Sequence, residues 1–126
     1  MDKKKLVLVV DDEEDILTYL GALLEDSGFE VVVARDGGHA LKLVGERRPD
    51  LITLDINMPE HSGTRAYRQL KSDENLKKIP VFIITAFDDM RVYLKKLVGF
   101  PFPEAFITKP VNPDELRMLI AEQFVQ

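Results

Sequence analysis

The sequence predicts a doubly wound α/β fold in which five helices cover a five-stranded parallel sheet. Five short apolar runs alternate along the chain with segments whose apolar residues recur at helical spacing. Strands that alternate with helices in this way form a parallel sheet with right-handed crossovers, and the helices lie on both of its faces. The pattern extends over the whole chain without a repeat or a linker. We therefore expect one domain over residues 1–126.

The composition is that of a globular, mildly acidic domain. Of the 126 residues, 45% are hydrophobic and 31% are charged, and the formal net charge of −5 argues against direct contact with nucleic acid. The absence of cysteine excludes disulfides, thiol catalysis and thiolate metal sites. The run at residues 6–10 is too short to span a membrane, and because two acids follow it at once, it is a strand and not a signal peptide. We expect a cytoplasmic protein without membrane contact.

Each expected strand is a short apolar run that ends at a polar or charged residue. Such runs, rich in β-branched residues, are typical of strands that are buried on both faces of a sheet. The expected strands are residues 6–10, residues 29–34, a run that ends at Asp55, residues 81–85 and residues 105–108.

The helices are indicated by their apolar spacing and by residues that start or stop a helix. Gly28 ends the first helix, and Asp36 opens the second. Asn112 caps the last helix, with Pro113 at its first position and Glu115 completing a capping box. A third helix is expected after a loop through Pro59 and Gly63. The apolar residues expected to face the core from the first, second, third and last helices are, in that order, Ile16, Leu17, Leu20, Leu23 and Leu24; Ala40, Leu41 and Val44; Ala66, Tyr67 and Leu70; and Leu116, Leu119, Ile120 and Phe124.

The segment before the last strand combines a fourth helix with a stiff apolar connection. The helix is expected to start at Asp88 and to include Leu97 and Val98. Residues 99–104 follow it, with two prolines and two phenylalanines among them. We expect Phe100 and Phe102 to cover the edge of the core, although a partner-binding patch is the alternative.

Five chemically distinctive residues stand at the ends of four strands. They are Asp11, Asp12, Asp55, Thr85 and Lys109. The carboxyl ends of parallel strands meet at one edge of a sheet, where ligands collect, so these residues are expected to converge. Three carboxylates and one ammonium give a formal charge of −2, and Mg²⁺ suits such an oxygen-rich cluster and would neutralise it. A phosphoryl group could then enter near Lys109 and Thr85.

These residues give the chain a clear resemblance to receiver domains of two-component response regulators. The resemblance rests on the acidic pair Asp11-Asp12, on the run from Leu54 to Pro59 around Asp55, on Thr85-Ala86 and on Lys109-Pro110, in the order of the family. It covers essentially the whole chain and implies the flavodoxin-like strand order 2-1-3-4-5. Each piece is weak alone, and together they are highly specific.

The resemblance implies a role for each residue of the acceptor site. Asp55 would be the phosphoacceptor, and its carboxylate would take a phosphoryl group from a phosphohistidine as an acyl phosphate. Asp12 would bind Mg²⁺ directly and Asp11 through water, with Asp55 and the backbone carbonyl of Asn57 as further ligands. Lys109 would pair with the phosphoryl oxygens.

Other residues match the switch of the family. Thr85 would donate its hydroxyl to the phosphoryl group, and Phe106 would be the aromatic residue that responds to it, or else a strand aromatic packed in place. Ala86 would leave access to the site open. The bond between Lys109 and Pro110 would be cis and aim the lysine.

The resemblance also implies partners and a readout. The donor would be a sensor histidine kinase or a histidine phosphotransfer protein, and the fourth helix, fifth strand and fifth helix would signal to an unknown downstream protein. A monomer or a weak homodimer is expected. The chain would not be a conventional enzyme, although it would promote its own phosphotransfer and dephosphorylation.

Two features depart from the usual family pattern. The segment from Thr85 to Lys109 is about two residues longer than the commonest family spacing, a slack that motif matching tolerates. Phe87 stands at the second position after the threonine, where the family sets the rate of dephosphorylation together with Asn57. A bulky apolar side chain there is expected to shield the acyl phosphate from water.

Three other functions fit parts of the sequence. A haloacid-dehalogenase-like phosphatase also uses an aspartate nucleophile and Mg²⁺, but it needs a second acid two residues on, where Asn57 stands. A flavin carrier would need a glycine- and hydroxyl-rich loop after the first strand, where this chain is acidic. A receiver-like module that binds partners without phosphorylation remains the main alternative. Taken singly, Asp11 or Asp12 could simply cap the first helix.

Overall fold

Five parallel strands form one sheet in the order β2-β1-β3-β4-β5, as predicted. The computed structural model describes residues 3–86, 95 and 97–124. The strands are β1 (Leu6–Val10), β2 (Glu30–Ala34), β3 (Leu51–Leu54), β4 (Val81–Thr85) and β5 (Ala105–Thr108). Three of them coincide with the predicted runs residue for residue. The second begins at Glu30, one residue later than predicted.

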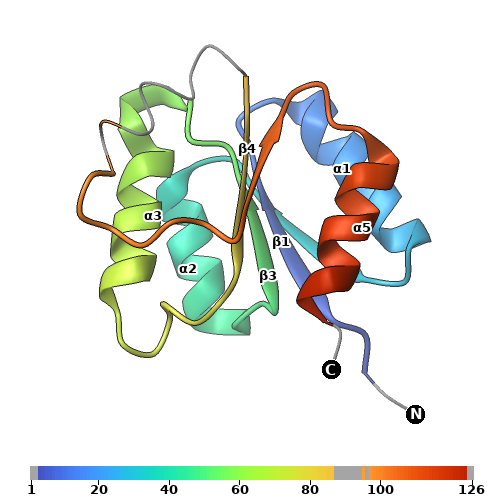
Figure 1. The fold of residues 1–126 in the computed structure, drawn as a ribbon, viewed down its shortest axis with the longest axis horizontal. Coiled ribbons are helices and arrows are strands. Elements are labelled where there is room, and N and C mark those ends of the chain that lie inside the picture. Colours follow the sequence, from blue (N-terminus) through green and yellow to red (C-terminus); the bar gives the residue numbers. More distant parts are fainter. Residues whose placement is uncertain (1–2, 87–94, 96, 125–126) are drawn as a thin grey trace.

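The described helices cover both faces of the sheet (Figure 1). They are α1 (Glu14–Asp26), α2 (Gly37–Arg47), α3 (Ser62–Ser72) and α5 (Pro113–Gln123), with a short 3-10 turn, η1 (Pro59–His61), before α3. Helices α1 and α5 lie on one face, and α2 and α3 lie on the other. The fourth predicted helix, from Asp88, falls mostly on residues 87–94 and 96, which lie outside the described part of the chain. Beyond them, Leu97 is buried, while Val98 is exposed.

The sheet separates two apolar cores, because its three central strands, β1, β3 and β4, are buried on both faces. Side chains alternate along β1: Val7 and Val9 pack towards α1 and α5, whereas Leu8 and Val10 pack towards α2 and α3. All five residues of β1 are buried, as are those of β4. The continuous apolar runs in the sequence therefore have a direct structural cause.

Side-chain caps fix the starts of α2 and α5 as the sequence predicts. The Oδ1 atom of Asp36 accepts a hydrogen bond from the His39 backbone N–H at 2.8 Å. The Oδ1 atom of Asn112 accepts one from the Glu115 backbone N–H at 3.0 Å, with Pro113 in the first turn. Gly28 follows α1 with a φ of 97°, a conformation that glycine adopts without strain.

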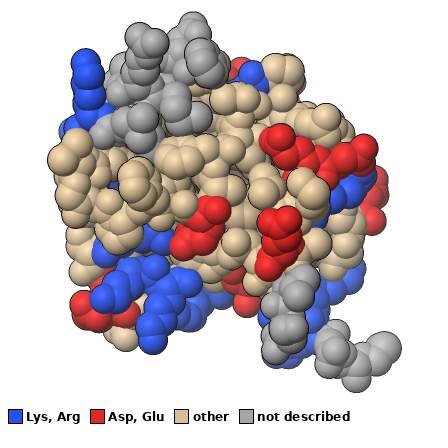
Figure 2. Space-filling model, viewed as in Figure 1, with Lys and Arg blue, Asp and Glu red and all other residues tan. Residues whose placement is uncertain are grey.

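The connection of residues 99–104 lies against α3. The Tyr67 hydroxyl donates to the Pro101 carbonyl at 2.6 Å, and the Arg68 guanidinium lies 5.7 Å from the centre of the Phe100 ring. Phe100 is partly buried against the α2–α3 core, as predicted. Phe102 is 75% exposed, so the prediction that it covers the core is wrong. Figure 2, which has the same view as Figure 1, shows mainly uncharged side chains where this connection runs.

None of the helices in the described part of the chain combines the length and the apolar character that crossing a membrane requires.

Candidate functional site

Asp55 lies directly after β3 and is held by the backbone around it. Its N–H donates to the Val10 carbonyl at 3.0 Å, which continues the pairing of β3 with β1. The Asn57 N–H donates to Asp55 Oδ1 at 2.8 Å. The residue is only 3% exposed. Its second oxygen, Oδ2, faces the side chain that comes from β5.

Asp11 occupies the equivalent position after β1. Its N–H donates to the Ala34 carbonyl at 3.1 Å, and its Oδ1 accepts from the Glu13 N–H at 2.9 Å. Asp11 is as deeply buried as Asp55. Two carboxylates from neighbouring strands are thus each fixed by one backbone N–H, and each has one oxygen left for another partner.

Lys109 supplies that partner from the end of β5. Its N–H donates to the Thr85 carbonyl at 2.9 Å, and its bond to Pro110 is cis, as the family resemblance implies. Its Nζ lies 2.9 Å from Asp11 Oδ2 and 3.1 Å from Asp55 Oδ2. Residues from β1, β3 and β5 therefore meet at the carboxyl edge of the sheet, as predicted.

Burial and charge act against each other in this site. Burial raises the pKa of Asp11 and of Asp55 above the ordinary value, although backbone N–H donors and Lys109 partly counteract it. Burial alone would lower the pKa of Lys109, but the hydrogen bond with Asp11 and the charge of Asp55 outweigh it and raise that pKa. Lys109 is therefore charged, and it stabilises two carboxylates that the site desolvates.

The carboxylates of Asp11, Asp12, Glu13 and Asp55 form an acidic cluster. One oxygen from each lies within 4.8 Å of one oxygen from each of the others. Asp12 and Glu13 are exposed, whereas Asp11 and Asp55 are buried. Hard oxygen donors gathered beside open solvent fit the demands of Mg²⁺, which binds carboxylates and keeps several waters. Asn57, whose carbonyl the family resemblance adds to this set, is exposed two residues after Asp55.

The predicted switch residues lie along β4 and β5. Thr85 is fully buried, and its hydroxyl has no hydrogen-bond partner among the described residues. Ala86, the next residue, is exposed. Phe106 is 36% exposed, so it is not packed into the core as an ordinary strand aromatic would be. Phe87 lies outside the described residues.

Gly63 brings the start of α3 against the acceptor loop. A Cβ atom at this position would overlap the Asp55 carbonyl oxygen and lie 2.8 Å from Ile56 Cα. Both contacts are with backbone, which cannot move aside as a flexible side chain can. Glycine at this position therefore lets α3 buttress the loop that holds Asp55.

Comparison with known proteins identifies the family. The model of the response regulator receiver domain matches residues 7–121. The chain belongs to this family. The receiver is 40% identical over 112 residues to the polar-differentiation response regulator DivK of Brucella anthropi, with 86% of each chain covered. It is 38% identical over 117 residues to the alkaline phosphatase synthesis transcriptional regulatory protein PhoP of Bacillus subtilis, covering 92% of the receiver but 46% of PhoP.

Solved structures agree with this assignment. The chemotaxis response regulator CheY4 of Vibrio cholerae superposes with a TM-score of 0.82 at 28% identity, covering 97% of the receiver and all of CheY4. The signal receiver domain of a histidine kinase from Syntrophus aciditrophicus superposes with a TM-score of 0.84 at 30% identity, covering 94% of the receiver and 89% of that domain. Receivers are thus found alone, in transcriptional regulators and in kinases.

Glu13 is a site residue that was not expected from the sequence. Its Oε1 lies 3.3 Å from Lys109 Nζ, and its carboxylate belongs to the acidic cluster. The signal was present, because Glu13 directly follows Asp11-Asp12, but acids at a helix start are common for reasons of the helix dipole alone. Only the fold, which brings Lys109 to the start of α1, distinguishes Glu13 from the acids after it.

Proposed function

We propose that this receiver accepts a phosphoryl group on Asp55, in the presence of Mg²⁺, from a histidine kinase or a histidine phosphotransfer protein. One observation carries the proposal. Lys109 Nζ lies 3.1 Å from Asp55 Oδ2, at an edge of the sheet that also holds the acidic cluster and the buried Thr85 hydroxyl. The proposed nucleophile, the lysine ammonium and the proposed hydroxyl donor thus come from the carboxyl ends of β3, β5 and β4.

The chemistry assigned to this chain is a transfer between two nucleophiles. A carboxylate oxygen of Asp55 forms a bond to phosphorus while the bond from phosphorus to the donor imidazole breaks, which leaves an acyl phosphate on Asp55. The hydrogen bond from the Asn57 N–H to Oδ1 orients the carboxylate. Lys109 compensates charge on the phosphoryl oxygens, and the Thr85 hydroxyl donates to one of them. The receiver is an acceptor of this kind and not a conventional enzyme.

Asp11, Asp12 and Asp55, with the Asn57 carbonyl, are the residues that would hold Mg²⁺. A bound divalent cation would supply positive charge where carboxylates and phosphoryl oxygens come together. Asp11 and Asp55 each already use one oxygen for a backbone N–H and so present the other to the site. The same oxygens lie within hydrogen-bond distance of Lys109, so cation and lysine would share them.

Phosphorylation would act as a switch through the end of β4. It adds roughly −1.5 to −2 charges to the site, and a change of this size shifts an equilibrium only if residues respond to it differently in two states. Thr85 and Phe106 lie on adjacent strands, β4 and β5, and Phe106 is partly exposed on the receiver surface. The readout is assigned to the face of helix four, strand β5 and α5, where a downstream protein would bind.

The test is intact-protein mass spectrometry after incubation with acetyl phosphate, with and without Mg²⁺, for the wild type and for Asp55→Asn. The expected result is one added phosphoryl group that requires both Mg²⁺ and Asp55. Beryllofluoride binding, followed by NMR, covers the case in which the acyl phosphate hydrolyses too fast to detect.

The outcomes separate this function from its alternatives. No adduct together with no binding of Mg²⁺ or beryllofluoride would leave a module that binds partners without phosphorylation. Continuous turnover of a generic phosphate ester would instead indicate a phosphatase. This function implies that the receiver acts in the cytoplasm, as a monomer or a weak homodimer.

A further inference from the structure

Glu13 is the third acidic partner of Lys109 and differs from the other two. Its Oε1 lies 3.3 Å from Lys109 Nζ, on the same ammonium that contacts Asp11 and Asp55. The side chains of Asp11 and Asp55 are 2% and 4% exposed, whereas that of Glu13 is 62% exposed. Glu13 is therefore the solvent-exposed one of the three carboxylates that Lys109 contacts.

The charge of Glu13 changes the electrostatics of the site. The four carboxylates of the acidic cluster and the Lys109 ammonium carry a formal charge of −3. One divalent cation reduces this charge to −1 and not to zero, so a negatively charged phosphoryl donor still meets net repulsion. Without Glu13 the same site would be neutral with the cation bound. One charge a few ångströms from the reacting groups of a partly exposed site measurably changes the rate at which a charged phosphoryl donor binds and transfers its phosphoryl group.

Glu13 also competes for the lysine that the phosphoryl group needs. Lys109 can compensate charge on the phosphoryl oxygens only as it leaves its carboxylate partners. Because the Glu13 side chain is exposed, its ion pair contributes little to folding stability. It nevertheless gives the Lys109 ammonium a third carboxylate partner in addition to Asp11 and Asp55.

We propose that Glu13 is a positioning residue that restrains phosphorylation of Asp55, because it holds Lys109 within the acidic cluster and leaves the cation-loaded site negative. This inference rests on the proposed function, and it adds a residue that sets the rate of that reaction. The inference concerns the rate at which Asp55 is phosphorylated. That Asp55 is the acceptor does not depend on Glu13.

The test compares rates of phosphorylation by acetyl phosphate at saturating Mg²⁺, determined separately for each variant. We expect Glu13→Gln to react roughly 3- to 10-fold faster than wild type at low ionic strength, as the removal of one nearby charge implies. The advantage should shrink to less than about twofold in roughly 0.5 M salt, where charges are screened within a few ångströms. Glu13→Asp keeps the negative charge on a side chain one methylene shorter, so its rate should lie between that of wild type and that of Glu13→Gln.

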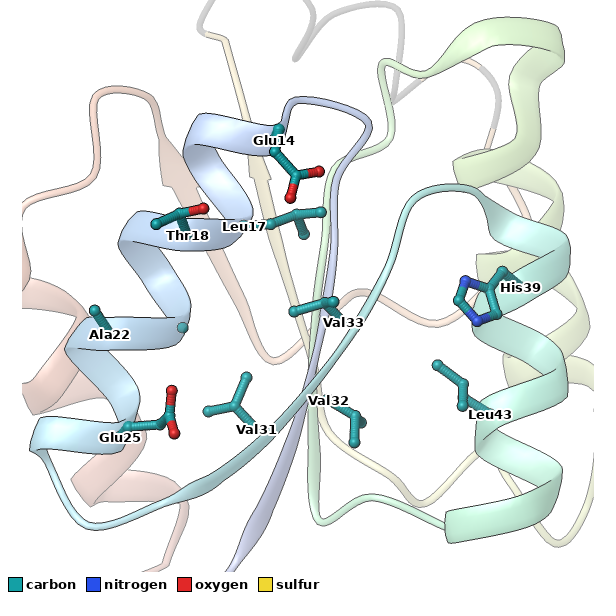
Figure 3. A pocket seen from close by; sticks show the side chains of 11 residues that line it. Glu14, Leu17, Thr18, Ala22, Glu25, Val31, Val32, Val33, His39 and Leu43 are labelled. Atoms are coloured by element: carbon teal, nitrogen blue, oxygen red, sulfur yellow. The ribbon is translucent and has the colours of Figure 1, made fainter.

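Glu14→Gln is the matched control. It removes the same charge one residue further along, but the Glu14 carboxylate pairs with Arg35 at 2.8 Å and not with Lys109. Glu14 lies at one end of the groove between α1, β2 and α2 (Figure 3). The Glu14→Gln rate should equal that of wild type.

Each contrary outcome has a distinct meaning. Equal rates for wild type and Glu13→Gln would overturn the inference and leave the proposed function intact. An equal acceleration in Glu14→Gln, or one that salt does not reduce, would also overturn it, because the effect would not belong to the Lys109 site. No phosphorylation of the wild type, together with no binding of Mg²⁺ or beryllofluoride, would overturn the proposed function, and this inference with it.

Discussion

Asp55 combines deep burial with a negative charge, and this combination is unfavourable for folding. Its carboxylate is compensated by one backbone N–H and by Lys109, which it shares with Asp11 and Glu13. Burial nevertheless dominates and raises the pKa of Asp55. The residue that the proposed chemistry needs is therefore one that weakens the fold while no cation is bound.

The first prediction concerns Asp55→Asn in the absence of Mg²⁺. Asparagine keeps the size of the side chain and an oxygen for the Asn57 N–H, but it carries no charge. We expect the variant to unfold at a higher temperature than wild type at neutral pH, by roughly 3–5 °C, the shift that about 1 kcal/mol produces in a domain of this size. Thermal unfolding followed by circular dichroism with a chelator present measures it.

The pH dependence of this difference has a defined sign. The folded-state pKa of Asp55 lies above the unfolded value, so protonation favours the folded wild type. That contribution is complete below the unfolded pKa and is lost as the pH rises through the folded-state pKa. The advantage of Asp55→Asn should therefore shrink as the pH falls from about 7.5 to about 4.5, towards the ordinary aspartate range. An advantage that grows over this range would contradict the burial argument.

At the scale of elements, a buried lysine fastens the connection of residues 99–104. The Lys71 side chain is 2% exposed, and its Nζ lies 3.4 Å from Glu104 Oε1 and from the Ile79 carbonyl. Glu104 also accepts from the Val81 N–H at 2.7 Å, so it joins α3 to the start of β4. Lys71 and Glu104 thus hold together the end of α3, the start of β4 and the residue before β5, at the edge of the sheet opposite to the acceptor site.

The second prediction is that Lys71→Met destabilises the receiver by about 2–3 kcal/mol, below the roughly 3–5 kcal/mol typical of a broken buried pair, because Glu104 is partly exposed. Urea unfolding measures the change. Lys77→Met is the matched control, since Lys77 pairs with Glu74 on the surface, and it should change stability by less than about 1 kcal/mol. If the two variants proved equally stable, the buried pair would not anchor the connection.

The sequence predicts strands better than it predicts the direction of single side chains. The strands β1 and β4 follow from apolar runs whose ends are marked by charge or by Pro80, and a strand buried on both faces needs no further information. Phe100 and Phe102 are two residues apart in one proline-rich connection, and their different burial depends on contacts with α3 that the local pattern does not encode.

The same limit applies to the acceptor site. The alternation of strands and helices places Asp11, Asp55 and Lys109 at one edge, because strand ends in a parallel sheet converge whatever the loops do. The contact of Glu13 with Lys109 joins residues that are 96 positions apart and depends on how the first turn of α1 faces β5. Two αL residues before α3, Glu60 and His61, are likewise not evident from residue type, because glycine is the usual choice for that conformation.

At the scale of the whole molecule, cation binding and folding should be coupled through the acidic cluster. A cation that binds only the folded receiver stabilises it by mass action, by about 2.7 kcal/mol at a concentration 100 times its dissociation constant. The negative charge that weakens the cation-free fold is the charge that binds the cation. Removal of Asp55 should therefore have opposite effects on stability with and without Mg²⁺.

The third prediction is that the melting temperatures of wild type and Asp55→Asn cross during a Mg²⁺ titration. Without Mg²⁺ the variant is more stable, because a buried charge is gone. With Mg²⁺ the wild type gains more, because the variant has lost one carboxylate of the four in the cluster. Thermal unfolding across the titration, with ionic strength held constant by NaCl, tests this. Parallel curves would mean that the cation acts by general screening, whereas a crossing would tie the instability of the cation-free receiver to the site that accepts the phosphoryl group.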